Sequence, residues 1–398
     1  MCGIRGVWKE RFGVVERDSP IQWKGIIMNK KTRACGIELL KIICMIMIVI
    51  SHSIPKYGEA AFPNSHINLL VPTKDVQTLV ILFFNYLGQM ANGPFIVCSA
   101  YFLLDSSSVK SRKVWNFVFD TFLFSIAFLV VGLGLGFDIP KSDIIRQILP
   151  ITYENNWFVG CYLLLYLIHP FLNMVIEKMS QKQLLTMNII AISLYCGIGF
   201  ILENKYYYTV FIGFIIYYFI TAYVKKYMQN LSANKKWNLW VMIFSVVAII
   251  VTIIVTNYFG FHLDVLKNQM CRWCKFINPF IVLFAISSFN LFKQMKFQNK
   301  AIETTASVSL LVYIIHENYI FYTYGKPLFF DYIYRTFGYE YVALWCLVFA
   351  AVCFVGSLII ALIYKYTLQK LVIKVCDILV TKGGKITDKV LSKIMNIS

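Results

Sequence analysis

Two side chains that could hold a proton or an anion lie inside one apolar segment of the sequence. Lys41 and His52 are eleven positions apart, and the residues between them are almost all apolar. A helix turns by about 100° per residue, so both side chains point the same way, separated by about 16 Å along the axis. An ionisable group costs about 2.5–3.5 kcal/mol in the middle of a membrane helix and often marks a substrate or proton path. A lysine that reaches the headgroups and a histidine bonded by a neighbouring helix would give the same pattern.

The composition indicates an all-α polytopic membrane protein. Hydrophobic residues make up 59% of the 398 residues, charged residues only 15%, and the mean hydropathy is +0.65. An average soluble domain has about 25% charged residues. Apolar stretches of about 20 residues, the length that crosses a bilayer, predict a bundle of about ten transmembrane helices at 35–54, 77–104, 114–137, 156–176, 185–203, 207–224, 238–257, 277–292, 303–323 and 341–364.

The basic residues predict which side of the membrane each segment occupies. Cytoplasmic segments carry an excess of Lys and Arg, and with both termini in the cytoplasm 27 of the 38 basic residues fall on that side. We therefore expect a multi-pass protein of the plasma or inner membrane, with a basic cytoplasmic extension at 1–34, a transmembrane domain at 35–365 and a basic cytoplasmic tail at 366–398. The net charge of +18 then reflects topology and attraction to the lipid bilayer, and we do not interpret it as nucleic-acid binding.

The titratable groups of the apolar segments can be ordered by depth at about 1.5 Å per residue. Lys41 and Asp120 lie at similar depths near the inner side, and either Asp120 or Glu38 could pair with Lys41. His52 and His316 both fall in the outer half. The sequence thus predicts a route that links the two faces, although a purely structural hydrogen bond explains His316 as well.

The eleven cysteines do not predict a metal site. Most lie in apolar segments, where cysteine behaves as a small hydrophobe. Only Cys271 and Cys274 have motif spacing, and no second Cys or His pair lies near them to complete a zinc site. We expect no metal and no permanently bound cofactor.

Four segments match one family pattern in the same order. They are Arg33–Lys41 followed by His52, Pro94–Leu104 with Ser99, Asn156–Phe158 with Trp157, and Ser307–His316 with Tyr313. Together they resemble the integral-membrane acyltransferase family of type 3, whose members have about ten spans, and they extend over about 33–365. The sequence departs from the family pattern in having Glu38 where Asp is usual, Lys41 where Arg is usual and Ala100 where Gly is usual.

The resemblance implies transfer of an acetyl or other short acyl group from cytosolic acetyl-CoA to a glycan hydroxyl on the other side of the membrane. A sugar hydroxyl needs a general base, and neutral imidazole can be that base. His52 would act in this way, or would carry the acyl group itself. Lys41 would attract the CoA phosphates or the thioester. The resemblance adds Glu38 and His316 to the catalytic residues, and it suggests that the nucleotide is held by Lys110, Arg112 and Lys113.

The expected contacts to the glycan acceptor are Asn85, Ser99, Trp157, Tyr313 and Glu317. Simpler interpretations stand beside these roles, because small and amide side chains join membrane helices and Trp is common at membrane interfaces. The basic loop residues also fit the charge bias of internal loops. A transporter or flippase of lipid-linked or small polar substrates explains the spans and buried charges equally well, but not the ordered matches. A membrane polymerase that joins lipid-linked sugars would favour Arg-rich external loops, and this sequence has few external Arg.

Overall fold

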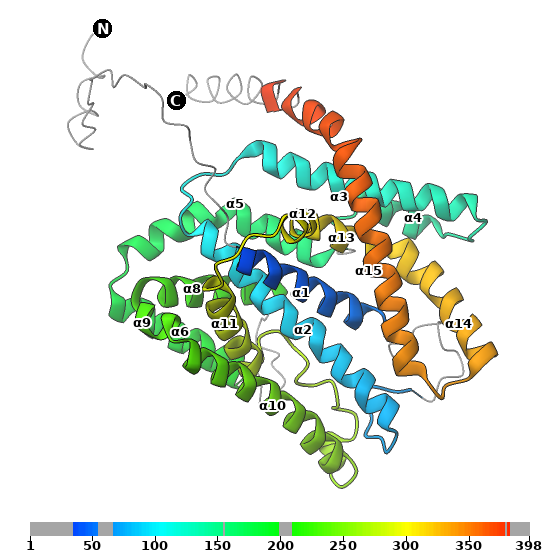
Figure 1. Ribbon diagram of the computed structural model, residues 1–398, viewed down its shortest axis with the longest axis horizontal. Coiled ribbons are helices and arrows are strands. Elements are labelled where there is room, and N and C mark those ends of the chain that lie inside the picture. The colour runs from blue at the N-terminus through cyan, green and yellow to red at the C-terminus, as the bar shows by residue number, and fades with distance from the viewer. Residues whose placement is uncertain (1–34, 55–66, 154–155, 199–208, 379, 383–398) are drawn as a thin grey trace. The chain divides into compact units, whose positions relative to one another are not determined.

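The described part of the chain is built from helices, and no strand occurs in it. The computed structural model describes residues 35–54, 67–153, 156–198, 209–378 and 380–382. The predicted N-terminal extension therefore lies outside the described residues, and the predicted tail is described only in part. The helices, labelled as in Figure 1, are α1 Cys35–His52, α2 Val76–Leu103, α3 Ser111–Gly134, α4 Lys141–Ile148, α5 Trp157–Lys178, α6 Gln181–Ala191, η1 Ile192–Ile198, α8 Val210–Tyr227, α9 Gln229–Ala233, α10 Lys235–Gly260, η2 Asp264–Leu266, α11 Pro279–Lys293, α12 Lys300–Ala306, α13 Ser309–His316, η3 Phe321–Gly325, α14 Lys326–Phe337 and α15 Val342–Tyr366.

Seven of the described helices are long and apolar enough to cross a membrane, namely α1, α2, α3, α5, α8, α10 and α15. They coincide with seven of the ten predicted spans, and they support a multi-pass membrane protein. A bundle of ten spans is not confirmed. The predicted span at 77–104 is one continuous helix, α2, with Pro94 inside it.

The remaining three predicted spans correspond to shorter or divided helices. The segment at 185–203 is described as α6 continued by η1 as far as Ile198, and α11 has only 15 residues. The segment at 303–323 is divided among α12, α13 and η3. It is broken after α13 because the Asn318 side chain accepts a hydrogen bond from the Ile320 amide, which starts a new turn. Hydropathy alone does not register such a polar break.

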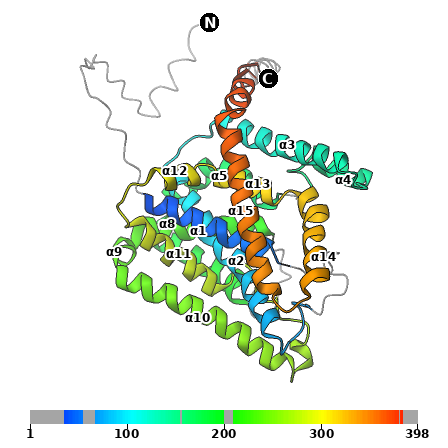
Figure 2. The same cartoon turned by 45° about the vertical axis from the view of Figure 1, so that its right-hand side comes forward.

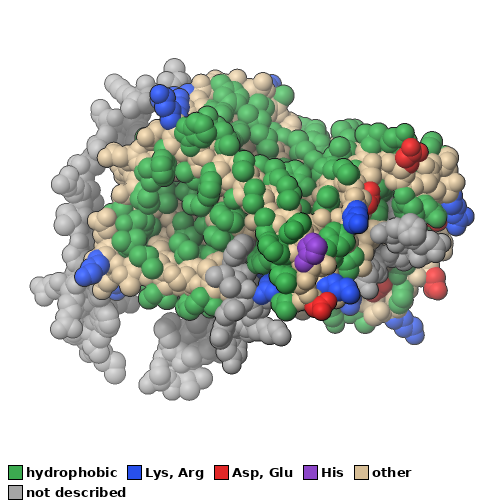
Figure 3. Space-filling model, turned by 90° about the horizontal axis from the view of Figure 1, so that it is seen from below, with side chains coloured by type: hydrophobic (Ala, Val, Ile, Leu, Met, Phe, Trp, Pro, Cys, Tyr) green, Lys and Arg blue, Asp and Glu red, His purple; other side chains and the backbone are tan. Residues whose placement is uncertain are grey.

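The helices differ in how much of their surface is buried. In the most apolar part of α2, 72% of the residues are buried, against 22% in α10 and 28% in α15. Because α10 and α15 remain strongly apolar, their exposed faces are those expected to contact lipid. Figure 3 shows one face of the molecule on which hydrophobic side chains predominate and charged ones are few.

Helix α1 packs closely against α2, as Figures 1 and 2 both show. It also contacts α11, α12, α13 and α15, so its side chains meet several helices from distant parts of the sequence. The approach to α2 depends on Gly88, because a Cβ at this position would lie 2.4 Å from the Ser51 hydroxyl oxygen. Small residues permit such contacts between membrane helices. This contact fixes α2 against the residue that precedes His52.

Candidate active site

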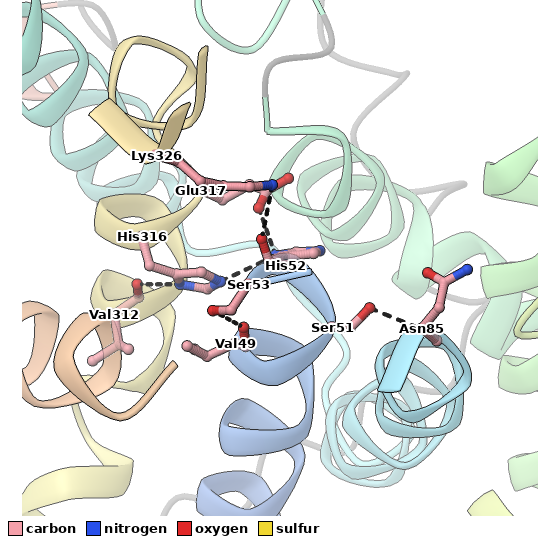
Figure 4. A network of polar contacts seen from close by, with 9 residues as sticks. All are labelled: Val49, Ser51, His52, Ser53, Asn85, Val312, His316, Glu317 and Lys326. Atoms are coloured by element: carbon pink, nitrogen blue, oxygen red, sulfur yellow. Dashed lines mark hydrogen bonds and ion pairs between the residues drawn. The ribbon is translucent and has the colours of Figure 1, made fainter. Parts of the chain in front are cut away.

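Three titratable side chains meet where α1 and α13 end, and we call them the His–Glu cluster: His52, His316 and Glu317. His52 Nδ1 lies 3.1 Å from His316 Nε2 and 2.5 Å from Glu317 Oε2 (Figure 4). The rings of the two histidines stack with their centroids 5.3 Å apart. His316 is buried, whereas the side chains of His52 and Glu317 keep 15% and 16% of their exposure. Residues that are 264 positions apart in the sequence thus form one site that retains access from outside.

The hydrogen bonds of the His–Glu cluster determine which ring nitrogen of each neutral histidine carries the proton. His316 Nδ1 lies 2.7 Å from the carbonyl oxygen of Val312, one turn earlier. A carbonyl oxygen only accepts, so His316 Nδ1 donates and its Nε2 keeps a lone pair. His52 Nδ1 must then donate in the contact with His316, and the Glu317 carboxylate lies beside the same nitrogen. The remaining nitrogen of His52, Nε2, therefore holds a lone pair that can take a proton.

A buried lysine supports the end of α1. Lys326, the first residue of α14, is 1% exposed, and its Nζ donates to the backbone carbonyl of His52 over 3.3 Å. The same ammonium lies 3.9 Å from the centre of the Tyr322 ring. A cation is favourable at a helix C-terminus, where carbonyl groups lack partners within the helix. The sequence alone does not indicate this role of Lys326, because a lysine in a predicted external loop has no signal that distinguishes it from any other loop charge.

Aromatic side chains connect the His–Glu cluster to α5. The Tyr313 ring is buried, with its centroid 6.4 Å from that of His52 and 5.7 Å from that of Phe158. Trp157, at the start of α5, lies against Phe158 and Phe276 with ring centroids 5.6 and 6.3 Å apart. Tyr313 is therefore in contact with the cluster, while the contacts of Trp157 are with other aromatic rings one step further away.

The other end of α1 carries a second group, the Lys–Tyr cluster: Lys41, Lys113, Tyr162 and Tyr166. Lys113 Nζ donates to the Tyr162 hydroxyl over 3.1 Å and lies 4.4 Å from the centre of the Tyr166 ring. Lys41 interacts electrostatically with Tyr162. Because Phe158, Tyr162 and Tyr166 follow one another at helical spacing on α5, this helix runs from the His–Glu cluster to the Lys–Tyr cluster. Lys41 and His52 therefore both belong to groups that meet the same helix.

Lys41 pairs with Glu38, whose carboxylate oxygen lies 3.4 Å from its Nζ. Glu38 is one of the two partners that the sequence suggested for Lys41. The other, Asp120, is buried on α3 and accepts a hydrogen bond of 2.5 Å from the Tyr364 hydroxyl of α15. The Lys41 ammonium also lies 5.8 Å from the centre of the Phe102 ring. Its side chain is 22% exposed, which leaves it able to meet a ligand.

The three basic residues expected to hold a nucleotide separate in the structure. Lys113 belongs to the Lys–Tyr cluster. Arg112 is turned to the C-terminal segment, where its Nε lies 3.0 Å from Asp377 Oδ1. The Lys110 side chain is exposed, and its backbone amide donates to the Tyr166 hydroxyl over 3.0 Å. One of the three, Lys113, thus contacts the tyrosine with which Lys41 also interacts.

Two further lysines, Lys225 and Lys293, lie near the end of α1 that carries Lys41. In the sequence they stand out only as loop charges. Lys225 Nζ is 4.2 Å from the centre of the Tyr101 ring and 2.6 Å from Asp105 Oδ1, and Lys293 Nζ is 5.3 Å from the same ring. Tyr101 precedes Phe102, which Lys41 approaches. A cavity of about 330 Å³ adjoins Lys225, and it is lined by Leu104, Asp105, Asn173, Ile176, Glu177, Ala222, Lys225, Lys226 and Gln229.

The remaining predicted acceptor contacts have partners within the protein. Ser99 donates to the Phe95 carbonyl one turn earlier over 3.2 Å, which is the behaviour of a structural helix serine. The Asn85 side chain lies 3.7 Å from the Cys271 sulfur, and its backbone carbonyl accepts from Ser51 over 3.3 Å. Glu317 contacts His52 directly, so its position fits a partner of the histidine as well as a contact to substrate.

Comparison with known families decides the class of the protein. The family model of an acyltransferase domain matches residues 36–365. The chain belongs to the type 3 acyltransferase family. The acyltransferase domain begins at the second residue of α1 and ends in the last turn of α15. Both clusters lie inside it, whereas Asp377, the partner of Arg112, lies outside.

Family membership makes this protein a membrane acyltransferase. No curated protein and no solved structure matches the chain. The acyl group, its donor and its acceptor therefore have to be argued from the acyltransferase's own residues.

Proposed function

We propose that the protein transfers an acetyl or other short acyl group from cytosolic acyl-CoA to a hydroxyl of a cell-surface or exported glycan. The observation that supports this most directly is the chain of hydrogen bonds from Val312 through His316 to His52. It leaves a lone pair on His52 Nε2, which is the atom a general base requires. Family membership provides the acyl-transfer chemistry for which such a base is useful.

The proposed step begins when His52 Nε2 takes the proton of the acceptor hydroxyl. The hydroxyl oxygen attacks the thioester carbonyl, the bond from carbon to sulfur breaks, and the CoA thiolate leaves. The proton on His52 Nε2 then passes to the thiolate. While His52 is an imidazolium, the Glu317 carboxylate at 2.5 Å stabilises its positive charge. An acyl group carried by His52 would use the same lone pair in a first step.

The Lys–Tyr cluster is the proposed entry for the donor. Lys41 and Lys113 present ammonium groups to an anion, Tyr162 and Tyr166 lie against Lys113, and Tyr101 lies against Lys225. Ammonium groups bind phosphates as point charges. The rise of about 16 Å between Lys41 and His52 is a span that the extended pantetheine arm of CoA can cross. We therefore assign the phosphates to the lysines and the thioester to the His–Glu cluster.

The distribution of basic residues supports an orientation for this route. With both termini in the cytoplasm of a plasma or inner membrane, the Lys–Tyr cluster faces the cytosol, where acyl-CoA is found, and the His–Glu cluster faces outward, where a glycan is presented. Tyr313 of α13 and Phe158 of α5, which follow one another from His52 towards Tyr162, would line the route.

Turnover of the thioester tests the proposal. Purified protein in proteoliposomes is incubated with acetyl-CoA labelled in the acetyl group, and free CoA thiol and labelled glycan are measured. We expect thiol release that depends on an added glycan acceptor and labelled product on the side opposite to the donor. A transporter or flippase would leave the thioester intact, and that result would refute the proposal.

A further inference from the structure

The His–Glu cluster has the donor atoms of a metal site. One nitrogen from each histidine and one carboxylate oxygen of Glu317 all lie within 4.8 Å of one another. The cluster is drawn from two helices that pack together, α1 and α13. No ligand spacing in the sequence indicates this group, because its members are far apart along the chain.

The distances suit a small divalent transition metal. Zinc binds His nitrogen at about 2.0–2.1 Å and carboxylate oxygen at about 2.0–2.2 Å, so two ligands in tetrahedral geometry lie about 3.3 Å apart. His52 Nδ1 and His316 Nε2 are already 3.1 Å apart. Glu317 Oε2, at 2.5 Å from His52 Nδ1, would move outward by less than about 1 Å.

The surroundings of His316 are also those of a metal ligand. Ligating histidines usually donate their second ring N–H to a carbonyl or carboxylate, which fixes the ring and directs the other nitrogen to the metal. His316 Nδ1 does so to the Val312 carbonyl at 2.7 Å, and its Nε2 faces His52. Two imidazoles and one carboxylate leave a fourth position open for water.

We propose that His52, His316 and Glu317 reversibly bind one Zn²⁺ ion and that this binding inhibits acyl transfer. Zn²⁺ takes the electron pair of His52 Nδ1, so the ring proton moves from Nδ1 to Nε2. Nε2 then lacks the lone pair that accepts the hydroxyl proton. The inhibitory half of the proposal rests on the proposed function, whereas the binding half does not.

Lys326 limits the affinity of the site for Zn²⁺. Its ammonium bonds the carbonyl of His52 and adds a positive charge beside a site for a dication. The site is therefore expected to fill when zinc is supplied and to empty when a chelator removes it. Replacement of this lysine by methionine should tighten zinc binding, which a site elsewhere in the protein would not show.

Zinc binding is measured directly on purified full-length protein in detergent, stripped with EDTA, by calorimetric titration with Zn²⁺. We expect one equivalent per chain, and an affinity at least about 100-fold weaker in His316→Gln, since loss even of a second-shell partner costs about 10- to 100-fold. Glu317→Gln, a change at a partly exposed side chain, provides a second variant if His316→Gln does not fold. The control is the double variant Cys271→Ser and Cys274→Ser, which removes the other pair of possible zinc ligands and should bind zinc normally.

The outcomes separate the site from the function. The whole proposal is supported by two results together. The wild-type protein binds one equivalent of zinc that the His316 or Glu317 variant does not bind, and zinc inhibits thiol release in a way that EDTA reverses. Absence of stoichiometric zinc, or its loss in the double cysteine variant alone, overturns the site. Zinc bound at the cluster without inhibition of an active protein overturns the regulation. If the protein released no thiol under any condition, the proposed function would fail while the binding result would still decide the site.

Discussion

Glu317→Gln tests most specifically what the charge of Glu317 contributes to the His–Glu cluster. The substitution keeps the shape of the side chain and removes its charge. In the wild-type protein the carboxylate lies 2.5 Å from His52 Nδ1, where it faces the positive charge that the ring acquires when Nε2 is protonated. A glutamine oxygen still accepts from Nδ1, but it does not stabilise an imidazolium to the same extent. The loss should therefore appear in the transition state.

The expected size of the effect follows from this contact. A hydrogen bond contributes about 1.5–3 kcal/mol when one partner is charged and about 0.5–1.5 kcal/mol when both are neutral, and each 1.36 kcal/mol corresponds to a tenfold change in rate. Because glutamine keeps the acceptor and loses only the charge, Glu317→Gln should lower kcat by the difference of about 1–1.5 kcal/mol, or about 5- to 15-fold. Removal of the base itself should cost about 10²- to 10⁴-fold, so the glutamine variant should retain measurable activity where an alanine at His52 has little or none.

The assay is thiol release from acetyl-CoA at saturating acceptor, with kcat and KM for the donor determined separately. KM for the donor should change little, because the proposed donor phosphates lie at the Lys–Tyr cluster, about 16 Å along α1 from His52. Glu340→Gln is the matched control, since Glu340 is an exposed carboxylate outside both clusters. An unchanged kcat in Glu317→Gln, or an effect confined to KM, would refute the assignment of Glu317 as a partner of His52.

Three further predictions concern the donor site, the packing of α1 and the start of α2. Lys41→Ala should raise KM for acetyl-CoA by about 10- to 150-fold through loss of one charge-assisted contact, while Lys41→Arg, which keeps the charge, should retain the wild-type KM. Gly88→Ala places a Cβ 2.4 Å from Ser51 Oγ and should reduce thiol release by displacing His52, and adding Ser51→Gly to the same protein should restore it. Asp75→Ala should lower the unfolding free energy by about 0.5–2 kcal/mol, because the Asp75 carboxylate caps α2 through hydrogen bonds from the residues that follow it.

The Asp75 prediction has a defined pH dependence. Partial burial raises the pKa of this carboxyl. The hydrogen bonds from Thr78 and Gln77 lower the pKa by more than burial raises it, so the net pKa lies below its ordinary value. A carboxyl with a lowered folded pKa stabilises the protein fully above its unfolded pKa of about 3.9, and the contribution is lost as the pH falls through the folded value. The melting temperatures of wild type and Asp75→Ala in detergent should therefore differ at pH 7 and converge below about pH 4.

Each of these three predictions has an outcome that contradicts it. Unchanged donor dependence in Lys41→Ala would make Lys41 only the ion-pair partner of Glu38. A Gly88→Ala protein as active as the wild type would show that the contact of α1 with α2 does not position His52. Equal melting temperatures for Asp75→Ala and wild type at neutral pH would show that the cap does not stabilise α2.

The sequence was sufficient to predict the longest helices. Seven predicted spans coincide with helices of membrane length, because continuous apolarity over about 20 residues is a strong signal. The segment at 303–323 is less continuously apolar and is divided among α12, α13 and η3, and one of its breaks lies where Asn318 accepts a hydrogen bond from the Ile320 amide. A hydropathy pattern does not contain the side-chain hydrogen bond found at this break.

The candidate site was predictable where residues share a helix or a motif. Helical spacing placed Lys41 and His52 on one side of α1, and depth placed His316 at the level of His52. The structure brings the two histidines to 3.1 Å. The spacing held no information on Lys326, which reaches the His52 carbonyl from a helix that begins 274 positions later. The sequence spacing also did not show that Arg112 and Lys113 have different partners: Arg112 pairs with Asp377, whereas Lys113 contacts Tyr162.

The most direct test of the account is thiol release from acetyl-CoA by the His52→Ala protein, measured with wild type and with His262→Ala. His262 is an exposed histidine that contacts Tyr258 and lies outside the His–Glu cluster. We predict that His52→Ala inserts into membranes and loses acyl transfer, while His262→Ala keeps it. Full acetylation of the acceptor by His52→Ala would contradict the proposal that His52 is the base.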